Sequence, residues 1–172
     1  MEMRTVLRLL VVGAAILTAG KCVAQAQVGV NAPHSKGGIA LSIKPRQGTV
    51  KAGAPVWVEL SETNNLDHAI GLPAGSPEDI YYFTVRDGQD KEVSLAAGSK
   101  AYTRDRPGQE RRWGGQFGEV RAGTTDSGAI EVSKYFDLSR PGVYTIQLEL
   151  VWIGPAPAWP LKTNTIKVTV VP

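Results

Sequence analysis

The chain has 172 residues, of which 42% are apolar and 20% are charged, a balance typical of one soluble domain with a hydrophobic core. Its formal charge of +3 falls to +1 without residues 1–26, because that segment holds three basic residues and one acidic residue. So small a charge gives no reason to expect nucleic acid or an anionic membrane surface as a partner. The 19 glycines and 11 prolines indicate many turns and little helix.

Residues 1–26 have the pattern of a secretory signal peptide. Two arginines precede an apolar run over 9–19, and Ala24-Gln-Ala26 offers small residues at the spacing that signal peptidase recognises. The apolar run is short for a membrane span. We therefore expect cleavage near Ala26, a flexible tether over 27–37, and a mature protein that is exported to the periplasm or the extracellular space and has no membrane span.

Cys22 offers an alternative, since a cysteine at this place can carry the lipid anchor of a bacterial lipoprotein. Lys21 argues against that interpretation, because the position before a lipid-bearing cysteine normally holds a small residue. If Cys22 leaves with the signal peptide, the mature protein has no cysteine. It then has no disulfide, no thiolate nucleophile and no cysteine-ligated metal.

Residues 38–172 carry the domain, and most of their apolar residues alternate with polar ones, as in half-buried strands. Between the predicted strands, Asn64–Asp79 reads as a long loop, and 96–128 is irregular except for a short strand expected near Phe117–Val120. The Asp87-Gly88 turn predicts a hairpin. The predicted strands are Ile39–Ile43 with a short continuation at Gly48–Lys51, then Pro55–Ser61, Ile80–Arg86, Lys91–Leu95, Ala129–Ser133, Val143–Trp152 and Thr163–Val171.

The stretch around residue 140 indicates how these strands are arranged. Asp137–Gly142 reads as a corner, with Pro141 and Gly142 supplying the turn geometry. Tyr144 follows at the start of the most regular alternating strand. This is the tyrosine-corner pattern of immunoglobulin-like domains, in which the tyrosine hydroxyl bonds to the backbone upstream. The predicted fold is all-β: an immunoglobulin-like β-sandwich of about seven antiparallel strands without a disulfide.

Three segments carry a resemblance to secreted bacterial immunoglobulin-like domains of poorly characterised function: Gly53-Ala-Pro-Val56, Tyr135–Tyr144 and Lys162–Val168. Similar corners occur in sandwich domains attached to secreted proteases and in the intracellular proteinase inhibitor of bacilli. The chain also resembles, more faintly, the chagasin-type inhibitors of cysteine proteases, through Pro157-Ala-Trp159. It departs from them at Asn64–His68, where their first inhibitory loop has another motif. This likeness implies a protease inhibitor acting through end loops.

Two loop tryptophans, Trp113 and Trp159, are the best candidates for contacting a partner, because tryptophan supplies much contact area at little ordering cost. Each is equally compatible with a plug at the end of the core. Asp67 and His68 are the polar candidates, and with Glu78 and Asp79 they offer oxygen and nitrogen ligands in one loop. Their spacing matches no metal motif, so we expect a solvated loop without a metal or cofactor.

Enzymatic activity is not expected, because no nucleophile-elbow motif marks a serine and His34 lies in the predicted tether. The four arginines at 104, 106, 111 and 112 are interpreted as a solvated loop and not as a nucleic-acid site. The predicted function is a secreted, non-enzymatic module that engages a protein partner in the cell envelope. The alternatives are a protease inhibitor and a carbohydrate-binding module that uses Trp57, Trp113 or Trp159. The sequence does not indicate an oligomeric state.

Overall fold

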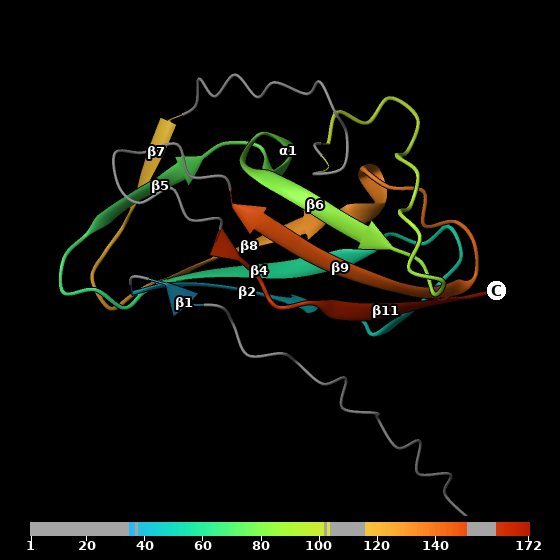
Figure 1. Ribbon diagram of the computed structural model, residues 1–172, viewed down its shortest axis with the longest axis horizontal. Helices are drawn as coiled ribbons and strands as arrows, with labels where there is room; N and C mark the ends of the chain where they lie inside the picture. Colours follow the sequence, from blue (N-terminus) through green and yellow to red (C-terminus); the bar gives the residue numbers. More distant parts are fainter. Residues whose placement is uncertain (1–34, 37, 102, 104–115, 151–160) are drawn as a thin grey trace, which may run out of the picture.

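A computed structural model describes residues 35–36, 38–101, 103, 116–150 and 161–172 of the chain. These residues form a mostly β structure with one short helix. No disulfide joins them, since Cys22 is the only cysteine in the sequence. Figure 1 shows two large sheets as separate layers, with a two-stranded sheet at the left.

The first sheet has the strand order β1-β2-β4-β8 and is antiparallel throughout. The second contains β6, β9, β10, β11 and β3, and the third pairs β5 with β7. Their bounds are β1 Ser35–Lys36, β2 Ile39–Pro45, β3 Thr49–Lys51, β4 Trp57–Asn64, β5 Ile70–Ala74, β6 Tyr81–Arg86, β7 Gln116–Val120, β8 Thr125–Glu131, β9 Gly142–Leu150, β10 Leu161–Lys162 and β11 Ile166–Val171. The helix α1 spans Pro77–Ile80, and a 3₁₀ turn spans Val132–Lys134.

The predicted alternation accounts for the core. Residues two apart on a strand share one face, so the apolar members of each pattern point into the space between the two large sheets. Leu41 and Val58 come from the first sheet and Phe83 and Ile146 from the second, and all four are buried in one cluster. Burying a side chain of this size contributes about 1.5–3 kcal/mol, so this cluster is the main source of stability.

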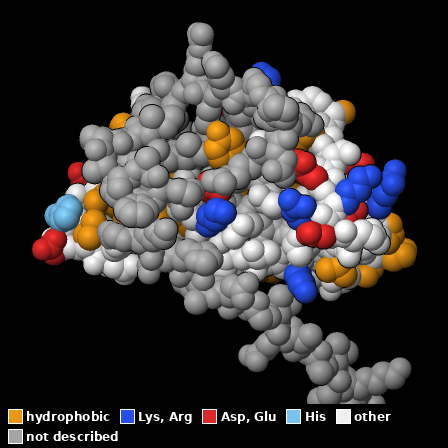
Figure 2. Space-filling view, viewed as in Figure 1, with side chains coloured by type: hydrophobic (Ala, Val, Ile, Leu, Met, Phe, Trp, Pro, Cys, Tyr) orange, Lys and Arg blue, Asp and Glu red, His pale blue; other side chains and the backbone are white. Residues whose placement is uncertain are grey.

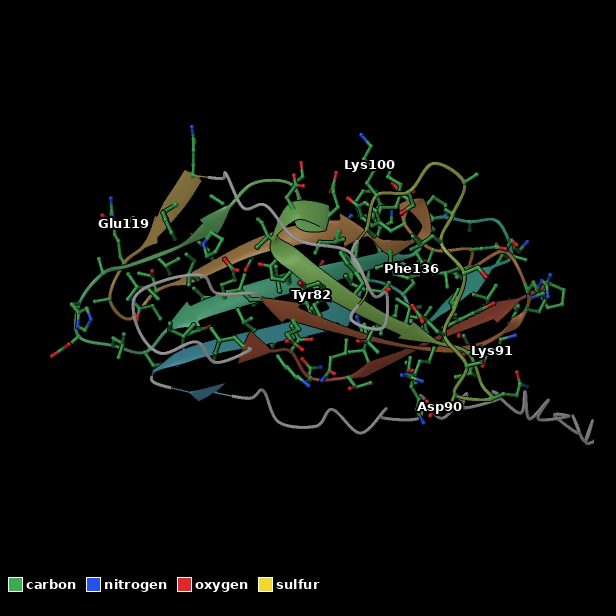
Figure 3. All side chains as sticks on the ribbon, turned by 45° about the horizontal axis from the view of Figure 1, so that its top comes forward. Tyr82, Asp90, Lys91, Lys100, Glu119 and Phe136 are labelled. Carbon is green, nitrogen blue, oxygen red and sulfur yellow. The ribbon has the colours of Figure 1, made fainter. Side chains whose placement is uncertain are left out.

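Aromatic rings fill the core near the turn after β8. The ring centroid of Phe83 lies 5.8 Å from that of Phe136 and 5.3 Å from that of Tyr135. Phe136 is buried, whereas Figure 3 shows the labelled Asp90 and Lys91 at the turn that follows β6. The Tyr135 hydroxyl donates to Glu78 Oε2 at 2.7 Å and so ties the 3₁₀ turn to α1.

The corner before β9 has the geometry that the sequence predicts. The hydroxyl of Tyr144 donates to the backbone carbonyl of Arg140 at 2.7 Å. The Asp137 carboxylate accepts from the backbone N–H of Ser139 at 3.2 Å, which holds the start of the turn. Pro141 is exposed and β9 begins at Gly142, so the corner is a short, hydrogen-bonded connection.

One strand pairing is parallel, which corrects the expectation of an entirely antiparallel fold. β3 runs alongside β11 in the same direction, with Val50 opposite Val170, and the N–H of Thr169 donates to the carbonyl of Gly48 at 2.9 Å. The chain thus passes from the first sheet in β2 to the second sheet in β3. Three residues carry too little pattern to reveal which sheet they join.

Several predicted boundaries differ from the structure. Asn64–Asp79 is not a loop throughout, because it contains β5 and α1. Lys91–Leu95 does not form a return strand; it makes single bridges at Glu92 and Leu95. β8 begins at Thr125, earlier than the predicted Ala129, and the short strand expected near Phe117–Val120 is present as β7. Ser35–Lys36, at the end of the predicted tether, pairs with β2 as β1.

Candidate functional site

The predicted polar candidates Asp67 and His68 lie together on the exposed turn between β4 and β5. His68 Nδ1 is 2.8 Å from Asp67 Oδ1, and the two side chains are 67% and 98% exposed. The hydrogen bond from His68 lowers the pKa of the Asp67 carboxyl. In Figure 2 the pale-blue histidine and an acidic side chain lie side by side at one tip of the molecule. Solvent surrounds this pair, and no group of three or more metal-ligating side chains occurs among the described residues.

Asn64 explains why that turn has its shape. Its side-chain amide is completely buried and donates to the carbonyls of His68 and Val120, at 2.8 and 3.0 Å. Its Oδ1 accepts from the N–H of Leu66 at 2.9 Å. One side chain therefore fastens the end of β4 to both the turn and β7. The turn is thus held by the buried side chain of Asn64, and its shape does not depend on the side chain of Asp67.

Of the three tryptophans predicted as possible contact residues, the structure describes only Trp57. Trp113 and Trp159 lie outside the described residues, as does 154–160, so the inhibitor and carbohydrate hypotheses that depend on them stay predictions. Trp57 is half-buried on the outer face of β4. The Arg46 guanidinium lies 5.1 Å from its ring centroid and the Lys134 ammonium 5.9 Å away. Trp57 thus covers the outer sheet surface, with cations over its ring.

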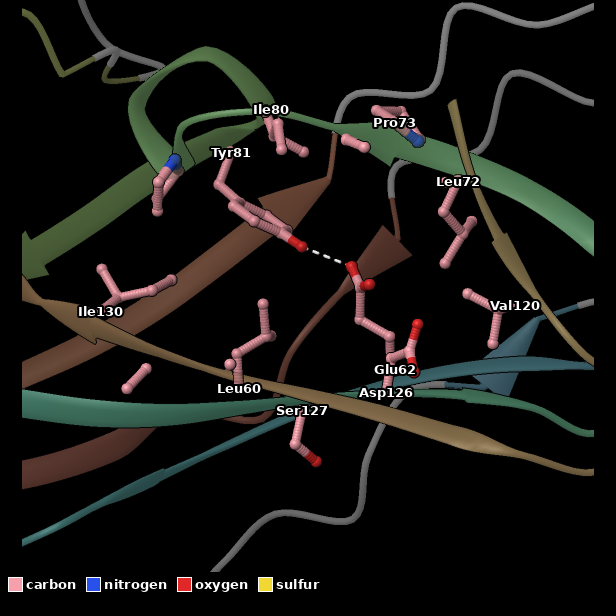
Figure 4. A pocket seen from close by; sticks show the side chains of 16 residues that line it. Leu60, Glu62, Leu72, Pro73, Ile80, Tyr81, Val120, Asp126, Ser127 and Ile130 are labelled. Atoms are coloured by element: carbon pink, nitrogen blue, oxygen red, sulfur yellow. Dashed lines mark hydrogen bonds between the residues drawn. The ribbon is translucent and has the colours of Figure 1, made fainter. Parts of the chain in front are cut away.

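The site that emerges from the structure is a cavity beside β8, not a loop. It has a volume of about 340 Å³ and lies between the inner faces of β4 and β8 and the small β5–β7 sheet. Figure 4 shows residues from both sheets converging on it, with the Tyr81 hydroxyl directed at Glu62. Its apolar lining comes chiefly from Leu60, Leu72, Val120 and Ile130.

Glu62 is the central polar group of this cavity. It follows Val58 and Leu60 on the inward-facing side of β4, where the alternation calls for another apolar residue. The hydroxyl of the buried Tyr81, on β6 in the opposite sheet, donates a hydrogen bond to the Glu62 carboxylate. Burial raises the pKa of Glu62, the hydrogen bond from Tyr81 lowers it, and the charge of Asp126 raises it further.

Asp126 adds a second carboxylate directly across the strand pair. It faces Glu62 in the register of β4 and β8, and both residues line the cavity. Among the described residues, no lysine or arginine forms an ion pair with either. Glu59, on the outer face of β4, is different: Lys44 Nζ lies 2.8 Å from it and Arg46 Nε 3.6 Å. The cavity therefore holds two like charges that repel each other and attract a cation.

Three consecutive small residues of β8, Ser127-Gly128-Ala129, line the cavity along the edge of the sheet. A Cβ placed on Gly128 would meet no atom within 4 Å. This absence of side-chain bulk gives access to Glu62 and Asp126 from the edge of the sheet. A ligand that suits the cavity has a cationic head for the two carboxylates and an apolar stem for the walls.

The sequence contained a signal for this site that the strand prediction did not use. The predicted second strand ends at Ser61, one residue before Glu62. Extending the alternation by one step would have placed a carboxylate inside the domain, and a buried carboxylate marks a candidate site. That Tyr81 and Asp126 lie next to it depends on long-range strand pairing, which no local pattern reveals.

Comparison of the chain with protein-family profiles and with curated proteins finds no match. Within the described residues there is no helix with the length and apolar character needed to cross a bilayer.

Proposed function

We propose that this chain is an exported, immunoglobulin-like β-sandwich that binds a protein partner in the cell envelope and has no enzymatic activity of its own. The observation that carries the proposal is the cavity beside β8, where Glu62 and Asp126 face open space without a cation among the described residues. Like charges held together with one of them half-buried cost stability, and a partner that brings a positive charge relieves that cost.

The strand order supports the immunoglobulin-like assignment. β2, β4 and β8 correspond to strands A, B and E of that fold, and β6, β9 and β11 correspond to C, F and G. Tyr144 stands at the start of β9, which is where the tyrosine corner belongs in the F strand. Among the described residues, no strand takes the place of strand D, which in the constant-type domain pairs with E.

Export is supported by the sequence pattern of residues 1–26, which is that of a secretory signal peptide. The test is to express the full chain with a carboxyl-terminal tag, fractionate the cells and measure the intact mass. We expect the exported form to begin near residue 27. A product that keeps residues 1–26 and stays in the cytosol would refute export.

The binding proposal is tested by photo-crosslinking in intact cells. A photoreactive phenylalanine derivative replaces Ser127, which lines the cavity from the edge strand β8 and whose side chain lies on the outer face of that strand, and the control carries it at Lys167, which is exposed on β11 in the other sheet. We expect the Ser127 variant to crosslink to a distinct protein and the Lys167 variant not to do so. The absence of a crosslinked protein at Ser127, or the same protein at both positions, would refute a partner at this site.

A further inference from the structure

We propose that the partner of this module binds by strand addition: an extended segment pairs with the free edge of β8 and places a lysine or arginine side chain in the cavity. This inference rests on the proposed binding function and names the chemistry of the partner. Three features carry it, namely unpaired backbone groups along β8, the absence of proline and lysine from that edge, and the charge of the cavity beneath it.

The register shows which backbone groups are free. In an antiparallel pair, opposed residues alternate between hydrogen-bonded and non-bonded positions. The N–H of Asn64 donates to Thr124 O at 3.0 Å and that of Val132 to Val56 O at 2.8 Å, so the even-numbered residues of β8 bond to β4. The backbone groups of the odd-numbered residues Thr125, Ser127 and Ala129 therefore face away from β4.

Side-chain contacts on the outer face agree with this assignment. Thr63 Oγ1 lies 2.9 Å from Thr125 Oγ1, and Ser61 Oγ lies 3.5 Å from Ser127 Oγ. Such close cross-strand contacts are expected at non-bonded positions, where opposed Cα atoms are nearest. No strand in the described part of the chain pairs with the outer edge of β8. Its outward N–H and C=O groups thus form a template for another strand.

The edges at β6, β5, β1 and β3 offer less. Glu92 bridges Arg86 at the end of β6, and the N–H of Val93 donates to Val85 O at 3.0 Å, so this edge is partly covered. β5 contains Pro73, which lacks an N–H. β1 and β3 have only two and three residues. β8 has seven residues and contains neither proline nor lysine, the residues that usually protect an edge.

Asp126 explains why the added strand should be basic. A carboxylate that points inward from an edge strand opposes pairing with an apolar strand, because pairing would bury its charge. The same carboxylate, with Glu62 opposite, favours a strand that carries a cation over the cavity. A lysine or arginine stem fits against Leu72 and Val120, and its charged head reaches the two acids. Glu62 and Asp126 thus attract a basic strand and disfavour an apolar one.

The test uses the full chain and a fluorescent peptide of sequence Ser-Thr-Val-Thr-Lys-Thr-Val-Thr-Ser with blocked ends. Anisotropy gives the Kd for this peptide, for its norleucine analogue, and for a version N-methylated at alternate residues. We expect the lysine peptide to bind at least tenfold more tightly than the norleucine analogue, about 1.4 kcal/mol, and the N-methylated peptide not to bind. Glu62→Gln combined with Asp126→Asn should abolish the preference for lysine.

Ala129→Pro tests the edge from the protein side. It removes an outward N–H and leaves the bonds to β4 in place, whereas Ala129→Ser is the control that keeps the N–H. We expect the proline variant alone to weaken binding at least tenfold, with its folding checked by circular dichroism. If it does not fold, the N-methylated peptide on the parent protein decides the question.

Different results refute the strand-addition proposal and the proposed binding function. Equal binding of the lysine and norleucine peptides, or of the N-methylated and parent peptides, refutes basic strand addition. No binding of the lysine peptide, with the Ser127 crosslink intact, also refutes strand addition but leaves the binding function standing. Loss of the crosslink refutes the binding function itself.

Discussion

Asn164 joins the two large sheets, and its replacement tests how the domain is held closed. Its side chain is fully buried; Oδ1 accepts from the N–H of Ile43 at 2.8 Å, and Nδ2 donates to the carbonyl of Ile43 at 2.9 Å. The amide acts as a one-residue strand partner for β2. Asn164→Ala leaves both backbone groups of Ile43 buried and unpaired, and each such group costs about 1–3 kcal/mol.

The expected destabilisation is therefore about 2–6 kcal/mol, and the unfolding midpoint should fall by roughly 10 °C or more. Urea unfolding followed by circular dichroism measures the first quantity and a thermal scan measures the second. The matched control is Asn65→Ala, which removes the same side chain from an exposed position and should change stability by less than about 0.5 kcal/mol. A cost below about 1 kcal/mol for Asn164→Ala would mean that water replaces the amide, and the sheets would not depend on this contact.

Three further substitutions test the corner and the cavity by urea unfolding. Tyr144→Phe removes the bond to Arg140 and should cost about 1 kcal/mol, whereas an unchanged midpoint would show that the corner does not need the hydroxyl. Gly128→Ala should stabilise the chain by about 0.4–1 kcal/mol, because alanine restricts the unfolded chain and its methyl group meets no atom within 4 Å in the folded state; a loss of stability would contradict that geometry. Glu62→Gln should raise the stability of the chain by more at pH 7 than at pH 4. Burial raises the folded-state pKa of Glu62, so the cost of its ionised form to stability grows as the pH rises above the ordinary pKa of a glutamate. A stability gain independent of pH would disprove this cost.

The alternating faces of the strands could be predicted from the sequence because they depend only on neighbouring residues. Leu41 with Ile43, and Phe83 with Val85, are buried as their patterns indicate. The corner at Tyr144 could also be predicted, since its parts lie within eight residues of one another, from Asp137 to Tyr144.

What could not be predicted depends on partners far along the chain. β5, with the sequence Ile-Gly-Leu-Pro-Ala, contains two residues that disfavour strands, and it forms because β7 pairs with it. Asn164 gives no local sign that it will be buried, because its partner Ile43 is 121 residues away. The cavity depends both on long-range strand pairing and on a polar side chain that gives no local sign of burial. Glu62 resembles a surface residue in the sequence, and only the folded chain places Tyr81 and Asp126 next to it.

The parallel pairing of β3 with β11 bears on the order in which the domain is assembled. Among the described strands, β3 pairs only with β11, which is the last of them in sequence. During synthesis, β2 can pair with β4 early, whereas β3 must wait until residues 166–171 have emerged. Completion of the second sheet is thus a late event, because it joins strands from the two ends of the domain.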